Sequence, residues 1–265
     1  MVFQVQRIRS SLAVNRDFAG SGGTRVMSGA GFSPRNLNGL LGWWDASVTA
    51  SLSLSGSTIL TIADQSGGGN TMGQFSANAE PIYNATGLNS RPSMMFTASL
   101  GHALESSGLF NLGTGNTLTL FAVAFMNSAA QSFARLISYT AGGQSHDYDN
   151  AGSFTLTRSS TSNAMVLSRA SGATGAAAVS LSTPFRIIVT ITSGGVTTIY
   201  INGVSAASGT IAGNFISGGR LNFGVGHLDA GTWDGAISEI GVATGFTGSV
   251  DVASLDSYLQ NKWGL

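Results

Sequence analysis

The feature that most constrains the fold is a series of short segments that are rich in β-branched and aromatic residues and separated by turns. Seven such segments occupy residues 117–126, 134–140, 152–158, 163–169, 185–192, 196–203 and 220–226. Within 196–203, Ile199 and Ile201 point to one face of a strand and Tyr200 to the other. With 37 glycines and almost no helical period, this pattern favours an antiparallel two-sheet sandwich of jelly-roll type over a parallel α/β sheet.

One segment breaks the strand pattern, SVDVASLDSYLQNKWGL at 249–265. Its apolar residues recur at helical spacing: Val252, Leu255, Leu259 and Trp263. Ser249 suits an N-cap, Asp251 lies favourably in the first turn and Gly264 suits a stop. We predict one amphipathic helix that closes the chain and packs on the sandwich.

Residues 1–36 have a different composition, with five arginines against one acid and the Gly/Ser-rich stretch SGGTRVMSGAG. This segment has no hydrophobic period, so we expect an extended arm at 1–36 followed by one domain at 37–265. We also expect the arm to dock on a neighbouring subunit of a homo-oligomer or a particle. The residues expected to make this attachment are Arg7, Arg9, Arg16 and Arg25.

Composition argues against several classes of partner. The net charge is formally zero, 9% of residues are charged and Lys262 is the sole lysine, so we expect no nucleic-acid binding. The absence of cysteine excludes disulfides, thiolate metal sites and thiol catalysis. The first twenty residues lack an apolar core typical of a signal peptide, and no apolar run is long enough for membrane insertion. We therefore expect synthesis in a host cytoplasm and release within a virion.

Several stretches, taken in order, resemble the laminin G-like, concanavalin A-like jelly-roll domains of bacterial and phage proteins. They are LLGWWDAS (40–47), ADQSGGGNTM (63–72), GLNSRPSMMFT (87–97), FRIIVTITSGGVTTIYINGV (185–204), WDGAISEIGVATGFTG (233–248) and SYLQNKWGL (257–265). The resemblance spans residues 38–265 and leaves out the arm. It implies a two-sheet antiparallel sandwich whose final strand is followed by a helix.

Two of the four tryptophans, Trp43 and Trp44, are adjacent. If LLGWWDA is a strand, one of them points into the sandwich and the other points outward. A bare outward tryptophan would leave a large aromatic surface in water. We therefore expect the closing helix to cover it, beside Trp263.

Glycoside hydrolysis requires two carboxyl groups a few ångströms apart, and few acids here meet that requirement. The only glutamates are Glu80, Glu105 and Glu239, and HDYD is the only strand-like stretch with the pattern acid, spacer, acid. Glu239 resembles a structural acid near the last strand of the family. From the residues alone we interpret it as a hydrogen-bonding group at a strand edge.

The stretch QSHDYDN, at 144–150, is the densest in chemical groups. We predict that His146, Asp147, Tyr148 and Asp149 bind glycans. Two alternatives stay open: a polysaccharide lyase that uses histidine and tyrosine as base and acid, with Arg158 neutralising a uronate, or an ordinary polar loop.

The resemblance implies calcium as a cofactor, because related sandwiches often bind it through loop oxygens. Asp64 and Asn70 are the candidate ligands, with Asp147 and Asp149 as a second pair. The alternative for Asp64 is an Asx turn that holds the Gly-rich loop.

Together these features lead to one expected function and one alternative. We expect a non-enzymatic phage virion surface protein, such as a capsid decoration, head-fibre or tail-associated protein, that contacts capsid or tail proteins and host-surface glycans. The alternative is a polysaccharide-degrading enzyme or a carbohydrate-binding module of one.

Overall fold

The computed structural model describes residues 31–75, 79–127, 131–170, 172–226, 231–245 and 248–265. In this part of the chain every strand pairing is antiparallel, and one α-helix, α1 (Ser249–Trp263), follows the last strand. Short 3₁₀ turns occupy Pro34–Asn36, Thr49–Ser51 and Ala98–Leu100. The predicted all-β class with one C-terminal helix is confirmed. No helix in the described ranges has the length and apolar character needed to cross a membrane.

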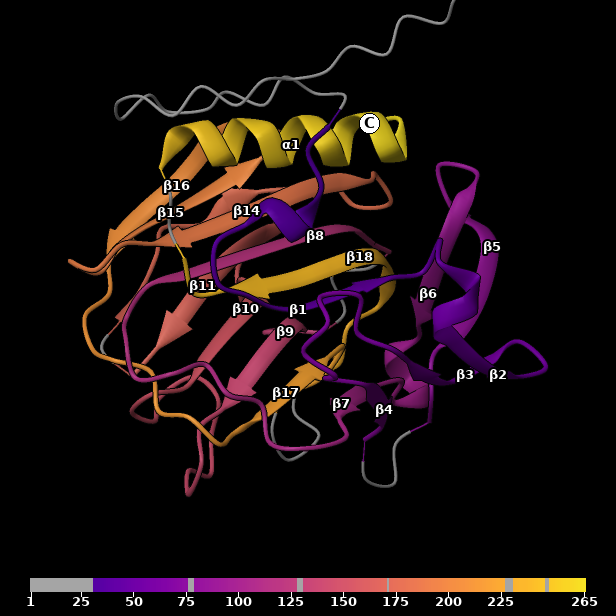
Figure 1. Ribbon diagram of the computed structural model, residues 1–265, viewed down its shortest axis with the longest axis horizontal. Coiled ribbons are helices and arrows are strands. Elements are labelled where there is room, and N and C mark those ends of the chain that lie inside the picture. Colours follow the sequence, from indigo (N-terminus) through magenta and orange to yellow (C-terminus); the bar gives the residue numbers. More distant parts are fainter. Residues whose placement is uncertain (1–30, 76–78, 128–130, 171, 227–230, 246–247) are drawn as a thin grey trace, which may run out of the picture.

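Six strands form the section of the sheet beneath α1 (Figure 1). In hydrogen-bonded order they are β1 (Leu40–Asp45), β18 (Gly235–Ala243), β8 (Leu118–Met126), β14 (Phe185–Ile191), β15 (Val196–Ile201) and β16 (Val204–Thr210). We call this the helix-side section. β8 is buried on both faces, because Leu120 faces the interior and Phe121 faces α1.

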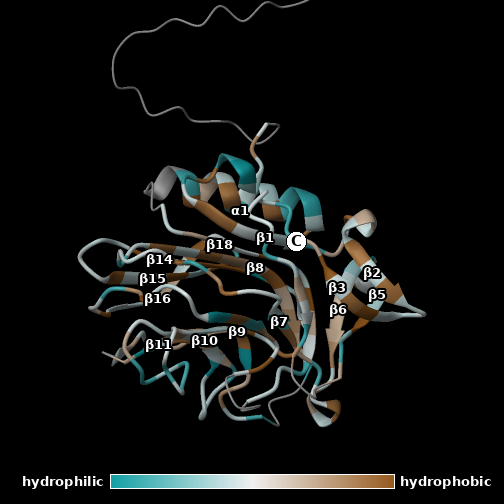
Figure 2. Cartoon of the chain, turned by 60° about the horizontal axis from the view of Figure 1, so that its bottom comes forward, coloured by the Kyte–Doolittle hydropathy of each residue, from teal (hydrophilic) through white to brown (hydrophobic). Residues whose placement is uncertain are grey.

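A second section lies on the side of the molecule away from α1 (Figure 2). Its strands are β7 (Leu104–Ser106), β17 (Arg220–Phe223), β9 (Arg135–Thr140), β10 (Phe154–Arg158) and β11 (Ala164–Arg169), with the short β12 (Gly172–Ala173) and β13 (Ala177–Ala178) both paired to β11. We call this the outer section.

Five further strands join the two sections. They are β2 (Leu52–Ser55), β3 (Thr58–Ile62), β4 (Met72–Gln74), β5 (Ile82–Leu88) and β6 (Arg91–Phe96). β6 pairs with β18 and β4 pairs with β7, so the hydrogen bonding is continuous from one section to the other. On the opposite side, the Gly175 amide donates to the Ser208 carbonyl at 3.1 Å and brings the two ends of the sheet together. The sheet is therefore nearly closed into a barrel, and the predicted arrangement of two separate sheets is not confirmed.

The main core lies between the two sections. Leu120 and Val189 of the helix-side section share one cluster with Leu156 and Leu167 of the outer section. Trp44 is fully buried in the same cluster, where its ring meets that of Phe223 edge-on at 5.0 Å between centroids. Burial of this apolar surface is the dominant favourable term in folding.

The second cluster lies beneath α1 and accounts for the tryptophan pair. Trp43 packs there with Leu255, Leu259 and Trp263, so the two neighbouring tryptophans enter different clusters. This confirms both the inward and outward orientations and the cover by the closing helix. The helix starts one residue earlier than predicted, because Gly248 and not Ser249 is the N-cap. Gly264 ends the helix as predicted, in the left-handed conformation (φ +67°) that favours glycine.

Candidate functional site

The candidate site is a cavity of about 360 Å³ on the outer section, lined by Phe133, Arg135, Tyr148, Thr155, Thr157 and Ser168. Its floor is the solvent-side face of β9, β10 and β11. Thr155 lies directly opposite Ser168 on β11 and opposite Ser138 on β9, so the strand register places hydroxyl groups in one row. The volume falls within the range of small-molecule sites, about 300–1,000 Å³.

A buried ion pair anchors one wall of the cavity. The Asp147 carboxylate accepts from Arg135 Nε at 3.1 Å and from Arg135 Nη2 at 3.3 Å, while Arg135 Nη1 donates to the Phe133 carbonyl at 2.8 Å. Asp147 is 1% exposed and Arg135 is 6% exposed. The pair ties the loop between β9 and β10 to the start of β9, and all three guanidinium nitrogens are engaged.

Tyr148 and Phe133 supply aromatic surface at the cavity. They are 46% and 50% exposed. The Arg135 guanidinium carbon lies 5.8 Å from the centre of the Tyr148 ring, which is within the range of a cation–π contact. The His146 ring stacks on Tyr148 with 5.8 Å between centroids, and His146 Nδ1 lies 3.2 Å from Asp149 Oδ1. The Tyr148 ring is thus held by neighbours while much of it stays open to solvent.

One buried hydroxyl of the floor has no hydrogen-bond partner in the protein. Thr155 Oγ1 is buried and makes no hydrogen bond to the protein, whereas Thr157 Oγ1 donates to the Ala134 carbonyl at 3.0 Å. A buried polar group without a partner costs free energy, and a hydrogen bond from a ligand or a water would remove that cost.

The four predicted glycan-binding residues belong to one loop, and the structure gives them different positions. Tyr148 lines the cavity, and the His146 ring stacks on the Tyr148 ring. Asp149 contacts His146, and Asp147 is buried against Arg135.

Sequence reasoning missed five residues that line the cavity: Phe133, Arg135, Thr155, Thr157 and Ser168. The alternation of threonines with Phe154 and Leu156 in the segment 152–158 was the signal for a polar face on β10. Arg158, the predicted partner of a uronate, is not among the residues that line the cavity.

The predicted calcium ligands hold a loop. Asp64 Oδ1 accepts from the amides of Trp43 (2.9 Å) and Ser66 (2.7 Å), and Oδ2 accepts from Ser66 Oγ (2.7 Å) and the Asn70 amide (3.1 Å). Asn70 Nδ2 donates to the Leu41 carbonyl at 2.8 Å. This is the Asx turn that stood as the alternative. Among the described residues, no group of three or more His, Asp or Glu side chains could hold a metal ion.

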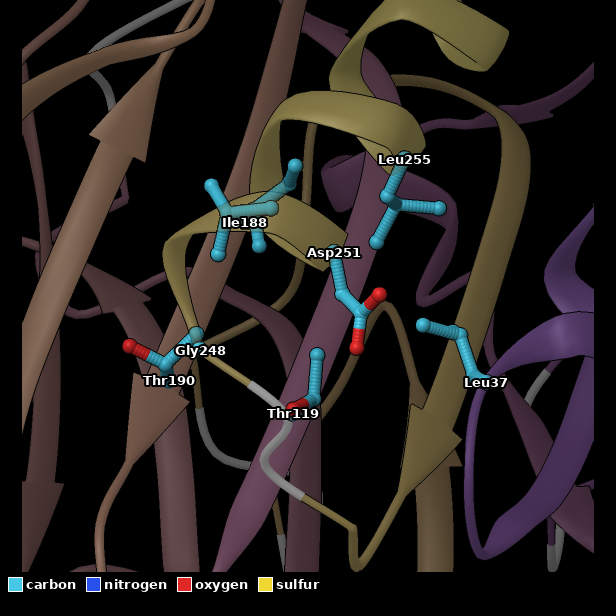
Figure 3. Close-up of a pocket in the computed structure, with 8 residues that line it drawn as sticks. Leu37, Thr119, Ile188, Thr190, Gly248, Asp251 and Leu255 are labelled. Carbon is cyan, nitrogen blue, oxygen red and sulfur yellow. The ribbon is translucent and has the colours of Figure 1, made fainter. Parts of the chain in front are cut away.

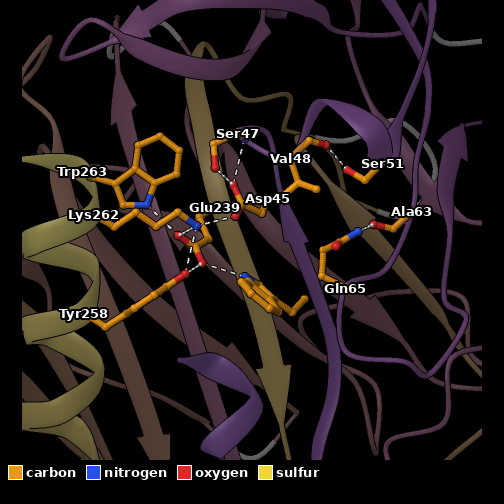
Figure 4. A network of polar contacts seen from close by, with 11 residues as sticks. Asp45, Ser47, Val48, Ser51, Ala63, Gln65, Glu239, Tyr258, Lys262 and Trp263 are labelled. Carbon is orange, nitrogen blue, oxygen red and sulfur yellow. Dashed lines mark hydrogen bonds and ion pairs between the residues drawn. The ribbon is translucent and has the colours of Figure 1, made fainter. Parts of the chain in front are cut away.

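Two carboxylates do lie together, beneath α1, where they dock the helix (Figure 4). Asp45 and Glu239 are register partners on β1 and β18, and each forms an ion pair with Lys262 Nζ. Glu239 also accepts from the indole N–H groups of Trp43 and Trp263, each at 2.6 Å. Glu239 is fully buried and β18 is paired on both sides, so the interpretation of Glu239 as a strand-edge residue is wrong.

The Asp45–Glu239 pair is closed to substrate. Both carboxylates are buried, whereas glycoside hydrolysis requires an open face between acid and base. Burial raises the pKa of Glu239, against the opposing effect of Lys262. Another cavity beneath α1, between the first turn of the helix and strands β8 and β14, is lined by Asp251, Thr119 and Ile188 among others (Figure 3). Its volume is about 10 Å³, the space of a single water, so it holds no larger ligand.

The predicted attachment residues Arg7, Arg9, Arg16 and Arg25 lie outside the described residues. The end of the predicted arm is described from Gly31 onward. Phe32 is buried there, and its ring meets that of Tyr258 on α1 edge-on at 6.4 Å between centroids.

Comparison with solved structures finds several proteins of similar fold at low sequence identity. Domain 4 of an extracellular GH43 arabinanase from Geobacillus stearothermophilus, in complex with arabinotriose, is 12% identical with a TM-score of 0.59, and the match covers 83% of this chain and 100% of that one. The binding domain of botulinum neurotoxin serotype G is 16% identical with a TM-score of 0.58, over 85% and 54% of the two chains. A Trypanosoma rangeli sialidase is 13% identical with a TM-score of 0.54, over 84% and 33%.

This chain thus spans about half of the toxin domain and a third of the sialidase. No protein-family model matches the sequence, and no curated protein matches it. At these identities the likeness shows the fold alone.

These structures correct the expected function. The prediction of a non-enzymatic phage virion surface protein is wrong, because the similar folds belong to an arabinanase and a sialidase and link the chain to no virion. They support the alternative of a polysaccharide-degrading enzyme or a carbohydrate-binding module of one.

Proposed function

We propose that the chain is a carbohydrate-binding module of a polysaccharide-degrading enzyme and that it binds a neutral oligosaccharide in the cavity of the outer section. The observation that carries this proposal is the pair of half-exposed rings, Tyr148 and Phe133, beside a floor of hydroxyl groups. Sugar rings have apolar C–H faces that pack on aromatic rings, and hydroxyl rims that need hydrogen-bond partners.

The ligand is neutral because the cavity offers no free charge. Arg135 is the only ionised residue among the six that line it, and Asp147 occupies its guanidinium. Thr155, Thr157 and Ser168 then provide the polar contacts. The arabinanase domain of similar fold was solved with arabinotriose, and this makes arabinotriose the first probe to use.

The test is calorimetric titration of the full chain with arabinotriose and a panel of neutral oligosaccharides, with and without calcium. We expect Tyr148→Ala and Phe133→Ala each to lower the affinity about tenfold or more, equivalent to about 1.4 kcal/mol. Val204→Ala, which truncates an exposed apolar side chain on β16, is the matched control and should leave affinity unchanged. Equal affinities for Tyr148→Ala and the wild type would reject the proposed site.

A second candidate function, polysaccharide lyase, is favoured by one observation. His146 and Tyr148, the predicted base and acid, stack on each other at the cavity, and Asp149 contacts His146. Incubation with acidic polysaccharides should then release unsaturated products that absorb in the ultraviolet, and His146→Ala should abolish this release. Absence of such products across a broad panel would reject the lyase function and leave carbohydrate binding as the proposed function.

A further inference from the structure

The guanidinium of Arg169 is buried without an anion. Arg169 ends β11 and is 4% exposed. Its Nη2 donates to the Gly213 carbonyl at 2.9 Å, but Nε and Nη1 have no hydrogen-bond partner. No ion pair of Arg169 occurs within the part of the chain that the structure describes. Three other arginines are buried in strands. Arg135 and Arg186 each pair with an aspartate, whereas Arg158 donates to the Gln131 carbonyl.

A buried cation without a partner is unfavourable, because the protein replaces the water around it with fewer dipoles. Here the compensation is incomplete. The Phe215 ring lies 4.0 Å from the Arg169 guanidinium carbon, a cation–π contact that stabilises one face of the group but accepts none of its in-plane N–H bonds. Burial lowers the pKa of Arg169 to about 10.

Arg169 also lines a cavity of about 200 Å³, separate from the proposed sugar site. The other lining residues are small or polar: Ala151, Gly152, Ala170, Ala212, Gly213 and Asn214. Ser168 and Arg169 are neighbours on β11, so their side chains leave opposite faces of the strand and serve different cavities. The Arg169 cavity is larger than a carboxylate group alone, and Arg169 is the one charged residue among the seven that line it.

We propose that the Arg169 cavity binds the carboxylate group of a small organic acid, with the unpartnered N–H groups of Arg169 as the donors. Arginine suits this role because its planar fork of donors matches the geometry of a carboxylate. Two sources supply this chemistry, an acidic sugar such as a uronate and a free organic acid. The site is independent of the neutral-sugar site, since it uses other residues and another cavity.

The experiment follows the Arg169 side-chain Nε–H signal and the Gly213 amide signal by NMR in the full chain. The probes are glucuronate, glucose and acetate at constant ionic strength. We expect glucuronate and acetate to shift both signals saturably and glucose to leave them unchanged, since glucose differs from glucuronate by lacking the carboxylate. Glucuronate binding at least tenfold tighter than acetate would assign the site to an acidic sugar, and similar affinities would assign it to a free organic acid.

Two variants complete the test. Arg169→Met should abolish glucuronate binding measured by calorimetry. Ala151→Trp fills the mouth of the cavity from an exposed position, leaves Arg169 in place and should weaken binding at least tenfold. Tyr148→Ala is the control, and it should retain glucuronate binding even if the neutral-sugar site fails. No saturable shift with either carboxylate, an equal shift with glucose, or binding that survives both cavity variants would overturn the proposal.

Discussion

Replacement of Asp147 by alanine tests whether the buried ion pair builds the sugar site. The change removes both acceptors of Arg135 Nε and Nη2 and leaves a guanidinium that is 6% exposed with only the Phe133 carbonyl as a partner. Removal of one member of a buried ion pair typically costs about 3–5 kcal/mol. Because Arg135 keeps one of its three contacts, we expect a loss near the lower end, about 3 kcal/mol.

The assay is urea unfolding with linear extrapolation to water, combined with titration of the oligosaccharide that the wild type binds. The oligosaccharide affinity should fall at least tenfold, although Asp147 is too buried to touch the sugar, because the loop that carries Tyr148 loses its anchor. The double variant Arg135→Met/Asp147→Leu leaves no buried charge and should regain stability to within about 1 kcal/mol of the wild type.

Glu105→Ala is the matched control, since the ion pair of Glu105 with Arg220 spans 3.5 Å and is partly exposed. Its loss should be about 0–1 kcal/mol. A loss below about 1 kcal/mol for Asp147→Ala would refute the reasoning, because the pair would then contribute no more than a surface contact.

Three further predictions concern stability. Thr155→Val replaces an unpartnered hydroxyl by a methyl group, so the free energy of unfolding should stay equal or rise by about 1 kcal/mol. The oligosaccharide affinity should fall. A clear loss of stability would contradict this prediction. Gly42→Ala places a Cβ 2.2 Å from Cη2 of Trp44 and should cost about 1–3 kcal/mol in urea unfolding, and unchanged stability would disprove that close packing. Burial raises the pKa of Glu239 above its ordinary 4.5, so the stability it contributes is complete below pH 4.5 and is lost as the pH rises through the folded-state pKa. The difference in unfolding free energy between the wild type and Glu239→Gln, which cannot ionise, should therefore narrow above pH 4.5. A difference that widens would mean that the folded protein lowers the pKa of Glu239.

The contacts of Glu239 illustrate how far sequence reasoning extends. A glutamate in a run of apolar residues near the last strand indicated a hydrogen-bonding role, and that part holds. The position of Glu239 in the middle of the sheet could not be predicted. Its partners Trp43 and Lys262 are distant in sequence and meet only when β1 pairs with β18 and α1 folds back over both strands.

The same distinction applies to the candidate site. The dense polar loop at 144–150 stood out in the sequence, and Tyr148 from that loop does line the cavity. The role of Asp147 could not be predicted, because it depends on where Arg135 lies. An irregularity in the pairing of β9 with β10 shifts Arg135 by one position, and no local sequence pattern encodes that shift. No sequence pattern marked Phe133 as a site residue, since its exposure follows from the path of the backbone that precedes β9.

The sequence by itself determined the short strands, the closing helix and the division of Trp43 and Trp44 between two faces. These properties depend on the period of apolar residues and on local caps and turns, and both are written along the chain. Only the tertiary structure decided that the strands join into one nearly closed sheet, that Asp147 pairs with Arg135 and that Arg169 has no carboxylate partner among the described residues. Those outcomes depend on which distant residues come within a few ångströms of one another, and the strand register and burial of the whole chain set that distance.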